Sequence, residues 1–338
     1  MSKKVAINGL GRIGKMVLWH YVTTKPENLE IVVANGGSGT PEDLAYMLKF
    51  DSVHGRFPSN IEYTDNSLII DQKEIAIVSE RDPEKLPWQS MNIDIVLEAT
   101  GKFVKKDDAA KHIKAGAKKV IITAPGKGVD KTIVLGVNQD EYDPLNHHVI
   151  SNASCTTNSL APAMKVLEEV FGVESALITT VHSYTSSQVT IDRKKPGKHR
   201  RGRAAAVNII PTTTGAAKAT TKVIPSLKGK MNAMALRVPT PDGAVTDISV
   251  VLKTQTTAEE INKAFEDYAN TQLKGILEIT YDEVVSSDIL GNPHSCIIDG
   301  ISTMVVDSNK AKILAWYDNE FGYARRVLEL AEFVAQKL

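Results

Sequence analysis

The sequence predicts an α/β fold in which a doubly wound parallel sheet domain is joined to an α+β domain with a mixed or antiparallel sheet. In the first half, short and nearly continuous apolar runs alternate with helical patterns, which is typical of a parallel sheet covered by helices on both faces. In the second half, the strand candidates alternate apolar and polar residues, which is typical of strands with one exposed face.

Composition limits the class of protein. The chain has 338 residues, 40 Lys+Arg against 40 Asp+Glu, and two cysteines, which excludes a disordered chain, a disulfide scaffold and a collagen-like repeat. Zero net charge argues against a chain built throughout to coat nucleic acid. The N-terminus lacks a signal-peptide pattern, and no apolar run approaches the roughly 18 residues of a spanning helix. We therefore expect a soluble cytoplasmic protein without a membrane partner.

The first elements form a βαβ unit. Residues 4–8 are a β-branched run, the glycine-rich turn 9–14 follows, a helical pattern comes next, and residues 30–34 form a second apolar run. Parallel pairing of such strands requires a right-handed crossover. Later strands of this domain are predicted at 93–97, 120–123, 133–135 and 148–150, with a helix at 107–115.

The pattern changes after about residue 151. We predict a helix at 156–170 and a strand at 176–181, followed by a basic loop at 192–203. Two alternating strands at 233–238 and 245–252 flank a turn at 239–243. An amphipathic helix at 258–273, a strand at 312–316 and a C-terminal helix with one apolar face complete the chain.

Gly9, Gly11 and Gly14 lie between a predicted strand and a predicted helix, which is the context of a dinucleotide fingerprint. The pyrophosphate would then lie at the helix N-terminus. The alternative is a tight turn with glycines for geometry alone. An acid that binds the adenosine ribose of NAD is missing from the tip of the second strand, which removes a barrier to NADP. NAD could still bind there through other contacts.

Cys155 lies between a strand end and a helix start, where the helix dipole and free N–H groups are expected to lower the pKa of its thiol. His182 ends an apolar strand, and it is either structural or the partner of this thiol. No ligand spacing predicts a metal site. A thiol, an imidazole and a dinucleotide site favour aldehyde oxidation through a thioester over a cysteine hydrolase. Cys296, in an apolar run, is interpreted as packing.

Five segments together resemble phosphorylating glyceraldehyde-3-phosphate dehydrogenase, in order and over essentially the whole chain. They are the segments 8–14, 151–158 (SNASCTTN), 211–217, 237–240 and 316–322. The resemblance implies a Rossmann domain of residues 1–153 completed by a helix at 319–338, a catalytic domain at 154–318, and a homotetramer. It further implies that D-glyceraldehyde 3-phosphate is oxidised reversibly to 1,3-bisphosphoglycerate with NAD or NADP, Cys155 being the nucleophile and His182 the base.

The resemblance also assigns binding residues. Ser154, Thr156, Thr214 and Gly215 match the inorganic phosphate site, which Arg201 would also serve, and Thr185 and Arg237 match the site for the substrate's own phosphate. Cofactor contacts are implied for Arg12, Ile13, Arg81, Thr123 and Asn319. Three positions depart from the family pattern: Gly36 replaces the ribose-binding Asp, Ser187 replaces a frequent Asp, and Ser159 replaces a frequent second cysteine.

Residues 193–203 contain seven cations and no acid. This segment is either a solvated loop, a nucleic-acid patch or, as the resemblance implies, a loop that reaches the cofactor of a neighbouring subunit. We expect Gly36 to permit, and Arg193 and Lys194 to attract, the 2′-phosphate of NADP. Two other functions stay open: erythrose-4-phosphate dehydrogenase, against which the TTTGAAK segment weighs, and a nucleic-acid-binding or regulatory protein. For the latter the loop has little aromatic interleaving, so no dedicated nucleic-acid partner is expected.

Overall fold

The computed structural model describes residues 2–338, which divide into two compact units. Unit 1 comprises residues 2–133, Gln139–Ser154 and Tyr323–Leu338, and unit 2 comprises Val134–Asn138 and Cys155–Gly322. The predicted division differs at the edges, because Ser154 belongs to unit 1, and the segments 134–138 and 319–322 belong to unit 2. The side chain of Asn319 accepts a hydrogen bond from Ser183 of unit 2, which explains the last assignment.

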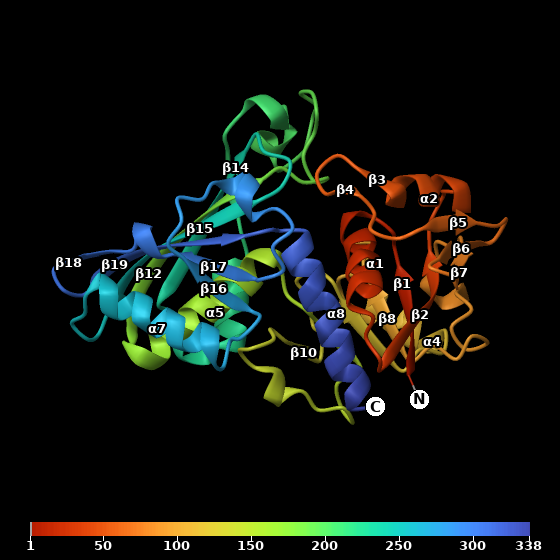
Figure 1. The fold of residues 1–338 in the computed structure, drawn as a ribbon, viewed down its shortest axis with the longest axis horizontal. Helices are drawn as coiled ribbons and strands as arrows, with labels where there is room; N and C mark the ends of the chain where they lie inside the picture. Colours follow the sequence, from red (N-terminus) through yellow and green to blue (C-terminus); the bar gives the residue numbers. More distant parts are fainter. Residues whose placement is uncertain (1) are drawn as a thin grey trace. The chain divides into compact units, whose positions relative to one another are not determined.

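Unit 1 is built on a nine-stranded sheet with the strand order β10-β11-β9-β8-β1-β2-β7-β6-β5 (Figure 1). The pairs from β10 to β7 are parallel, and β7, β6 and β5 pair antiparallel at one edge. The strands are β1 (Lys3–Asn8), β2 (Leu29–Asn35), β5 (Ile61–Tyr63), β6 (Ser67–Ile70), β7 (Lys73–Val78), β8 (Ile95–Glu98), β9 (Lys119–Ile122), β10 (Lys131–Thr132) and β11 (Val149–Ser151). A small hairpin joins β3 (Phe50–Asp51) and β4 (Gly55–Arg56). The helices are α1 (Arg12–Thr24), α2 (Pro41–Lys49), α3 (Lys106–Ala109), α4 (Lys111–Lys114) and α8 (Phe321–Gln336).

The glycine turn between β1 and α1 shows why two of its glycines are required. Gly9 has a φ of +105°, a backbone conformation that is strained in a residue with a side chain. A Cβ on Gly14 would lie 2.1 Å from the carbonyl oxygen of Gly9, so only glycine lets the first turn of α1 approach β1 this closely. The neighbours of β1 are β2 and β8, so the chain leaves β1 at the point where the strand order reverses. Open α/β sheets bind ligands at such a point.

Unit 2 is built on an eight-stranded sheet with the order β13-β14-β12-β15-β19-β17-β16, and β18 also pairs with β19. The strands are β12 (Val173–Ser183), β13 (Ile210–Thr213), β14 (Met231–Val238), β15 (Ala244–Leu252), β16 (Leu277–Thr280), β17 (Cys296–Asp299), β18 (Met304–Val306) and β19 (Lys310–Tyr317). The helices α5 (Cys155–Val170), α6 (Ala216–Val223) and α7 (Ala258–Asn270) pack against it, and α5 and α7 lie on the same side (Figure 1).

Three details differ from the sequence prediction. The strands β14 and β15, which flank the turn 239–243, do not pair with each other: β12 lies between them, parallel to β14 and antiparallel to β15. The helix predicted at 107–115 is broken at Ala110, whose ψ of −14° interrupts the helical hydrogen bonds. The strand predicted at 133–135 lies earlier, at β10, and the chain then passes into unit 2.

Each unit has its own apolar core. In unit 1 a buried cluster around Trp88 includes Val96 and Val120 of the parallel strands. In unit 2 the buried residues of α5 pack with Phe265 of α7 and with the sheet. Cys296 is one of these core residues, fully buried in β17, which agrees with its interpretation as packing. No helix within residues 2–338 combines the length and the apolar character that a membrane crossing requires.

Candidate active site

Cys155 is the first residue of α5, so its thiol stands at a helix N-terminus as predicted. The chain reaches this position through Ala153, which adopts a left-handed conformation with a φ of +57°. The hydroxyl of Ser151 supports the turn, because it accepts hydrogen bonds from the N–H groups of Ala153 and Gly126 and donates one to the carbonyl of Ala124. The start of α5, with the first backbone N–H groups of the helix, therefore lies beside the sulfur.

Unit 2 places His182 beside this thiol. The Nε2 atom of His182 lies 3.5 Å from the Sγ atom of Cys155. His182 is the penultimate residue of β12, and the parallel register with β14 pairs it with Arg237. Arg237 thus reaches the other ring nitrogen of His182. Its NH1 atom lies 2.5 Å from Nδ1 of His182 and 2.9 Å from the carbonyl oxygen of Ser183.

Two contacts of Nδ1 of His182, with Arg237 and with the carbonyl oxygen of Ser183, require different tautomers of the ring. A guanidinium can only donate hydrogen bonds, so Nδ1 must accept from it and cannot carry a hydrogen. The single hydrogen of the neutral ring then resides on Nε2 and points toward the sulfur of Cys155. If Arg237 moved away, Nδ1 could carry the hydrogen and donate it to the carbonyl oxygen of Ser183, which lies 2.9 Å from it. In that tautomer Nε2 is free to accept a proton.

Burial decides the charge state of this pair. Removal from bulk water raises the pKa of the Cys155 thiol, although the charge of Arg237 and hydrogen bonds from Thr156 act in the opposite direction. Loss of solvent, together with the charge of Arg237, lowers the pKa of His182 to about 3. The lowered thiol pKa expected from the helix N-terminus is therefore wrong here, because desolvation of the thiolate outweighs the helix contribution. The raised pKa of Cys155 and the lowered pKa of His182 each favour the neutral form of the group.

Polar groups around the pair hold it in place. The hydroxyl of Tyr317, at the end of β19, lies 2.9 Å from the hydroxyls of both Thr156 and Thr180, and its ring packs edge-on against His182. The hydroxyl of Ser183 donates to Oδ1 of Asn319 at 2.8 Å. That bond fixes the orientation of the Asn319 amide. Its Nδ2 group therefore points away from Ser183 and can donate a hydrogen bond to another group.

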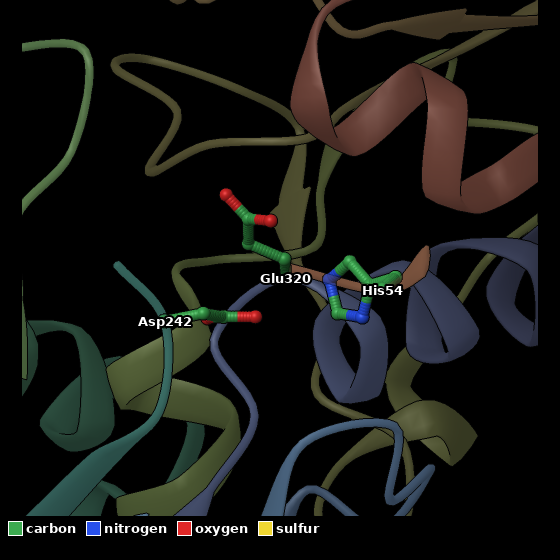
Figure 2. A group of neighbouring side chains, drawn as sticks. All are labelled: His54, Asp242 and Glu320. Atoms are coloured by element: carbon green, nitrogen blue, oxygen red, sulfur yellow. The ribbon is translucent and has the colours of Figure 1, made fainter. Parts of the chain in front are cut away.

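Two carboxylates of unit 2, Asp242 and Glu320, add negative charge to this region, and their oxygens lie within 4.8 Å of each other (Figure 2). The charge of Asp242 contributes to the raised pKa of Cys155, and that of Glu320 opposes the lowering of the His182 pKa. His54, the third residue labelled in Figure 2, belongs to unit 1. The predicted absence of a metal site remains a prediction.

Apart from Ser154, which belongs to unit 1, the residues assigned to phosphate binding lie in unit 2. Thr185 follows β12, and its hydroxyl contacts that of Ser187 at 2.8 Å. Arg201 donates from Nε to the hydroxyl of Thr212 at 2.8 Å and from NH2 to the carbonyl of Thr213 at 3.3 Å, which holds it next to the 214–215 segment. Gly215 caps the N-terminus of α6 without a side-chain bond, and a Cβ there would meet nothing within 4 Å. The N–H of Ala216, the first residue of α6, donates to the hydroxyl of Thr214 at 3.2 Å. A helix N-terminus beside an arginine suits a phosphate.

A pocket of about 490 Å³ opens in unit 1 at the carboxyl ends of β1, β2 and β8. Gly9, Gly11, Gly36 and Arg81 line it, as predicted for a cofactor site. The cap residue Gly11 makes no side-chain hydrogen bond, and a Cβ there would meet nothing within 4 Å, so the N-terminus of α1 is open to a ligand. The pocket therefore fits the pyrophosphate of a dinucleotide.

Other predicted cofactor residues have different surroundings. The guanidinium of Arg12 forms an ion pair with Asp51, which also binds Lys15 at 2.7 Å. The side chain and N–H of Thr123 are tied to the carbonyl of Glu98. Ile13 and Gly14 lie in the first turn of α1, behind the lining of the pocket. Arg193 and Lys194 are exposed on a loop of unit 2, whereas Gly36 belongs to unit 1.

Sequence reasoning missed several partners. The contact between Arg237 and His182, and that of Tyr317 with Thr156 and Thr180, join segments that are distant in sequence. It also missed Glu98, a fully buried carboxylate at the pocket edge. An acid directly after the apolar run 93–97 is the pattern that could have identified it, since a charge at the end of a buried strand needs partners.

Comparison with known proteins agrees with this geometry. Residues 3–106 match the glyceraldehyde 3-phosphate dehydrogenase NAD-binding domain, and residues 154–319 match the C-terminal domain of the same family. The chain is 52% identical to glyceraldehyde-3-phosphate dehydrogenase 2 of Bacillus subtilis (strain 168), covering 100% of this chain and 98% of that protein. It is 52% identical to the enzyme of Geobacillus stearothermophilus (100% and 99% covered) and 51% identical to that of Streptomyces coelicolor (100% of both). With the thiol, imidazole and dinucleotide pocket in place, the chain belongs to the glyceraldehyde-3-phosphate dehydrogenase family.

Proposed function

We propose that this protein is a phosphorylating glyceraldehyde-3-phosphate dehydrogenase that oxidises D-glyceraldehyde 3-phosphate and transfers the acyl group to inorganic phosphate. The observation that supports this most is the 3.5 Å approach of the Cys155 sulfur to Nε2 of His182, at the N-terminus of α5. The thiol adds to the aldehyde carbon, and the new carbon–sulfur bond gives a thiohemiacetal on Cys155. N–H groups at the helix start stabilise the oxygen as its negative charge develops.

His182 and Arg237 control the proton. In the absence of an anion, Arg237 donates to Nδ1 of His182 and leaves a hydrogen on Nε2. The phosphate of the substrate draws this guanidinium toward itself through charge-assisted hydrogen bonds. The ring then has its hydrogen on Nδ1, which donates it to the carbonyl of Ser183. Nε2 becomes the base that takes the thiol proton, returns it to the oxygen of the thiohemiacetal, and takes it again as the hydride leaves. The proton goes back to the sulfur when phosphate has displaced the thiolate. Arg237 thereby links occupation of the substrate phosphate site to activation of the base.

Oxidation and acyl transfer follow on Cys155. A nicotinamide dinucleotide held by the pocket that Gly9, Gly11 and Gly36 line would supply the acceptor for the hydride, with its two electrons, of the thiohemiacetal carbon. Asn319 presents its Nδ2 group because its Oδ1 is held by Ser183, which suits recognition of a carboxamide oxygen. A phosphate oxygen then attacks the thioester carbon, the carbon–sulfur bond breaks, and 1,3-bisphosphoglycerate leaves. Arg201, Thr214 and the N-terminus of α6 at Gly215 form the site for that phosphate.

We further propose that the enzyme accepts NADP as well as NAD. Gly36 lines the dinucleotide pocket, so no carboxylate stands there to repel a 2′-phosphate. A Cβ at Gly36 would lie 2.4 Å from Cδ1 of Leu44, so a larger residue there requires Leu44 to move. Arg193 and Lys194 supply exposed positive charge on the loop that the family resemblance assigns to a neighbouring subunit's cofactor.

The proposal includes a homotetramer in the cytoplasm. One face of the unit 2 sheet exposes apolar side chains, with Leu177 71%, Val306 62% and Met304 52% exposed, beside a groove of about 830 Å³. An apolar patch of this kind is typical of a protein interface. Two free cysteines, one of them the nucleophile, suit a reducing compartment.

The two cysteines provide the direct test of the nucleophile. Cys155→Ser is expected to lose turnover by a factor of at least about 10³, because a serine hydroxyl is far less acidic than a thiol. Dinucleotide affinity, measured by calorimetric titration, is expected to stay within about twofold, because the pocket in unit 1 does not include Cys155. Cys296→Ala, in the core of the same unit, is the control and is expected to keep kcat. An active Cys155→Ser variant would refute the proposed mechanism.

A further inference from the structure

Glu98 is the last residue of β8, and its side chain is only 1% exposed. Its oxygens receive hydrogen bonds from the side chain of Asn8, from the N–H and hydroxyl of Thr100, and from the ring of His112. The Thr100 hydroxyl accepts from the N–H of Lys102, so its own hydrogen points to Glu98. All partners of the Glu98 carboxylate therefore act as donors.

The tautomer of His112 is fixed from its far side. Nε1 of Trp88 lies 2.9 Å from Nδ1 of His112, and an indole N–H can only donate. Nδ1 is therefore the acceptor, and Nε2 carries the hydrogen that it donates to Oε2 of Glu98 at 3.0 Å. Nδ2 of Asn8 lies 3.4 Å from the same Nε2, but both atoms carry hydrogens, so the acceptor that they share is Glu98.

Two asparagines extend the network from Glu98 toward the loop after β2. Nδ2 of Asn8 donates to Glu98 at 2.5 Å, which leaves Oδ1 of Asn8 to accept from Nδ2 of Asn35 at 2.8 Å. Oδ1 of Asn35 in turn accepts from the N–H groups of Glu80 at 3.2 Å and Gly37 at 3.4 Å. Each amide therefore has one permitted orientation, and the hydrogen bonds all run toward Glu98.

This network ends on the dinucleotide pocket. Asn8, Asn35, Gly37, Glu80 and Thr100 all line the pocket, whereas Glu98, His112 and Trp88 do not. Phe103, another lining residue, packs edge-on against the ring of His112 at a centroid distance of 6.4 Å. The carboxylate of Glu98 also sits in register with Asn8 across the β1–β8 pair, so the sheet holds both groups in place. Glu98 thus fixes the lining of the pocket without being part of it.

We infer that Glu98, supported by His112 and Trp88, is a positioning residue for the dinucleotide: it orients Asn8, Asn35 and Thr100 so that the pocket is shaped for the cofactor before it binds. This inference rests on the proposed function, since it concerns the same cofactor. In Glu98→Gln an amide replaces the carboxylate, and its NH₂ group faces partners that are themselves hydrogen-bond donors. Asn8 or Thr100 must then turn to avoid the contact between two donors. Dinucleotide binding must restore the original orientation of these side chains in the pocket lining. The free energy that this costs weakens the binding of the dinucleotide.

The test uses Glu98→Gln, His112→Leu and His112→Gln in the full-length enzyme. Calorimetric titration of NAD and NADP without aldehyde is expected to show a Kd raised about tenfold or more for Glu98→Gln and His112→Leu. His112→Gln can still accept from Trp88 and donate to Glu98, so it is expected to recover most of the affinity. At saturating dinucleotide, kcat and the KM for the aldehyde are expected to stay within about twofold, because Glu98 does not touch the Cys155 site.

Ile121→Ala is the matched control. Ile121 is fully buried in the neighbouring strand β9 and makes no side-chain hydrogen bond, so its truncation destabilises the unit without changing the polar network. Even where Ile121→Ala lowers the Tm as much as Glu98→Gln does, its dinucleotide Kd is expected to match that of the wild type. Wild-type affinity in Glu98→Gln, or an equal loss in Ile121→Ala, would overturn the inference. If Glu98→Gln fails to fold, the two His112 variants decide. A wild-type protein that binds neither dinucleotide would instead refute the proposed function.

Discussion

At the residue scale, Arg237 has two effects on the same imidazole. Its charge lowers the pKa of His182, and its hydrogen bond to Nδ1 selects the tautomer that cannot act as a base at Nε2. In the proposed mechanism, both effects end when the guanidinium turns to the phosphate of the substrate. The same charge lowers the pKa of Cys155, in opposition to the larger effect of burial. The substrate phosphate is therefore expected to affect kcat as well as KM.

Removal of Arg237 should change the pH dependence of the reaction. In Arg237→Gln the pKa of His182 is expected to rise above its value of about 3, because the repelling charge is gone. A base loses activity as the pH falls through its pKa, so the acid limb of the kcat/KM profile for glyceraldehyde 3-phosphate should move to higher pH. The KM should also rise, since a phosphate ligand is lost.

Arg201→Gln is the control for this experiment. Arg201 is held by Thr212 and Thr213 and does not contact His182, so its loss should weaken inorganic phosphate binding and leave the acid limb in place. An unchanged acid limb in Arg237→Gln, or the same shift in both variants, would contradict the role given to Arg237.

The single residues also show where sequence reasoning succeeds. Cys155 and His182 could be identified because each has a local context, a helix start and a strand end, that the sequence displays. The contact of Arg237 with His182 depends on the register of β12 against β14, which no local pattern specifies. Glu98 depends in the same way on partners from two other segments, Asn8 and His112.

At the scale of elements, the turn between β1 and α1 was predictable because glycine geometry is local. Gly9 needs its left-handed φ, and Gly14 needs close contact between helix and strand. The pairing of β12 between β14 and β15 was not predictable, because strands next to each other in sequence usually pair across a short turn. Here β12, formed earlier in the chain, occupies the place between them.

The basic loop 193–203 is the element that we expect to select the cofactor. Lys194→Leu should lower kcat/KM for NADP about tenfold and leave that for NAD within about twofold, because a lysine contact to a 2′-phosphate exists only with NADP. Lys198→Leu, which removes a charge from the same exposed loop, serves as the matched control. Equal effects on both cofactors, or a wild-type enzyme with a large preference for NAD, would contradict this selection.

At the scale of the whole molecule, each unit holds one part of the proposed site. Unit 1 holds the dinucleotide pocket, and unit 2 holds the thiol, the base and the residues assigned to both phosphates except Ser154. The composition of the chain predicted two domains because length and periodicity are global properties of the sequence. The boundaries between the units could not be predicted from the sequence, because residues 134–138 and 319–322 belong to unit 2 through tertiary contacts.

The open face of the unit 2 sheet leads to a prediction about assembly. Light scattering in solution is expected to give the mass of four 36.8 kDa chains, and Leu177→Lys should lower that mass by placing a charge on the apolar face. Leu145→Lys is the control, because Leu145 is 82% exposed but belongs to unit 1. A monomeric wild type, or a tetramer unaffected by the charge on Leu177, would refute this interface.

The central claim is that a thioester on Cys155 is cleaved by inorganic phosphate. It is tested by mixing the enzyme with glyceraldehyde 3-phosphate and oxidised cofactor in phosphate-free buffer and measuring the reduced cofactor formed per subunit. We predict a burst of about one equivalent that then stops, a mass increase on Cys155, and steady turnover once phosphate is added. Continuous turnover without phosphate, or a burst that persists in Cys155→Ser, would contradict the account.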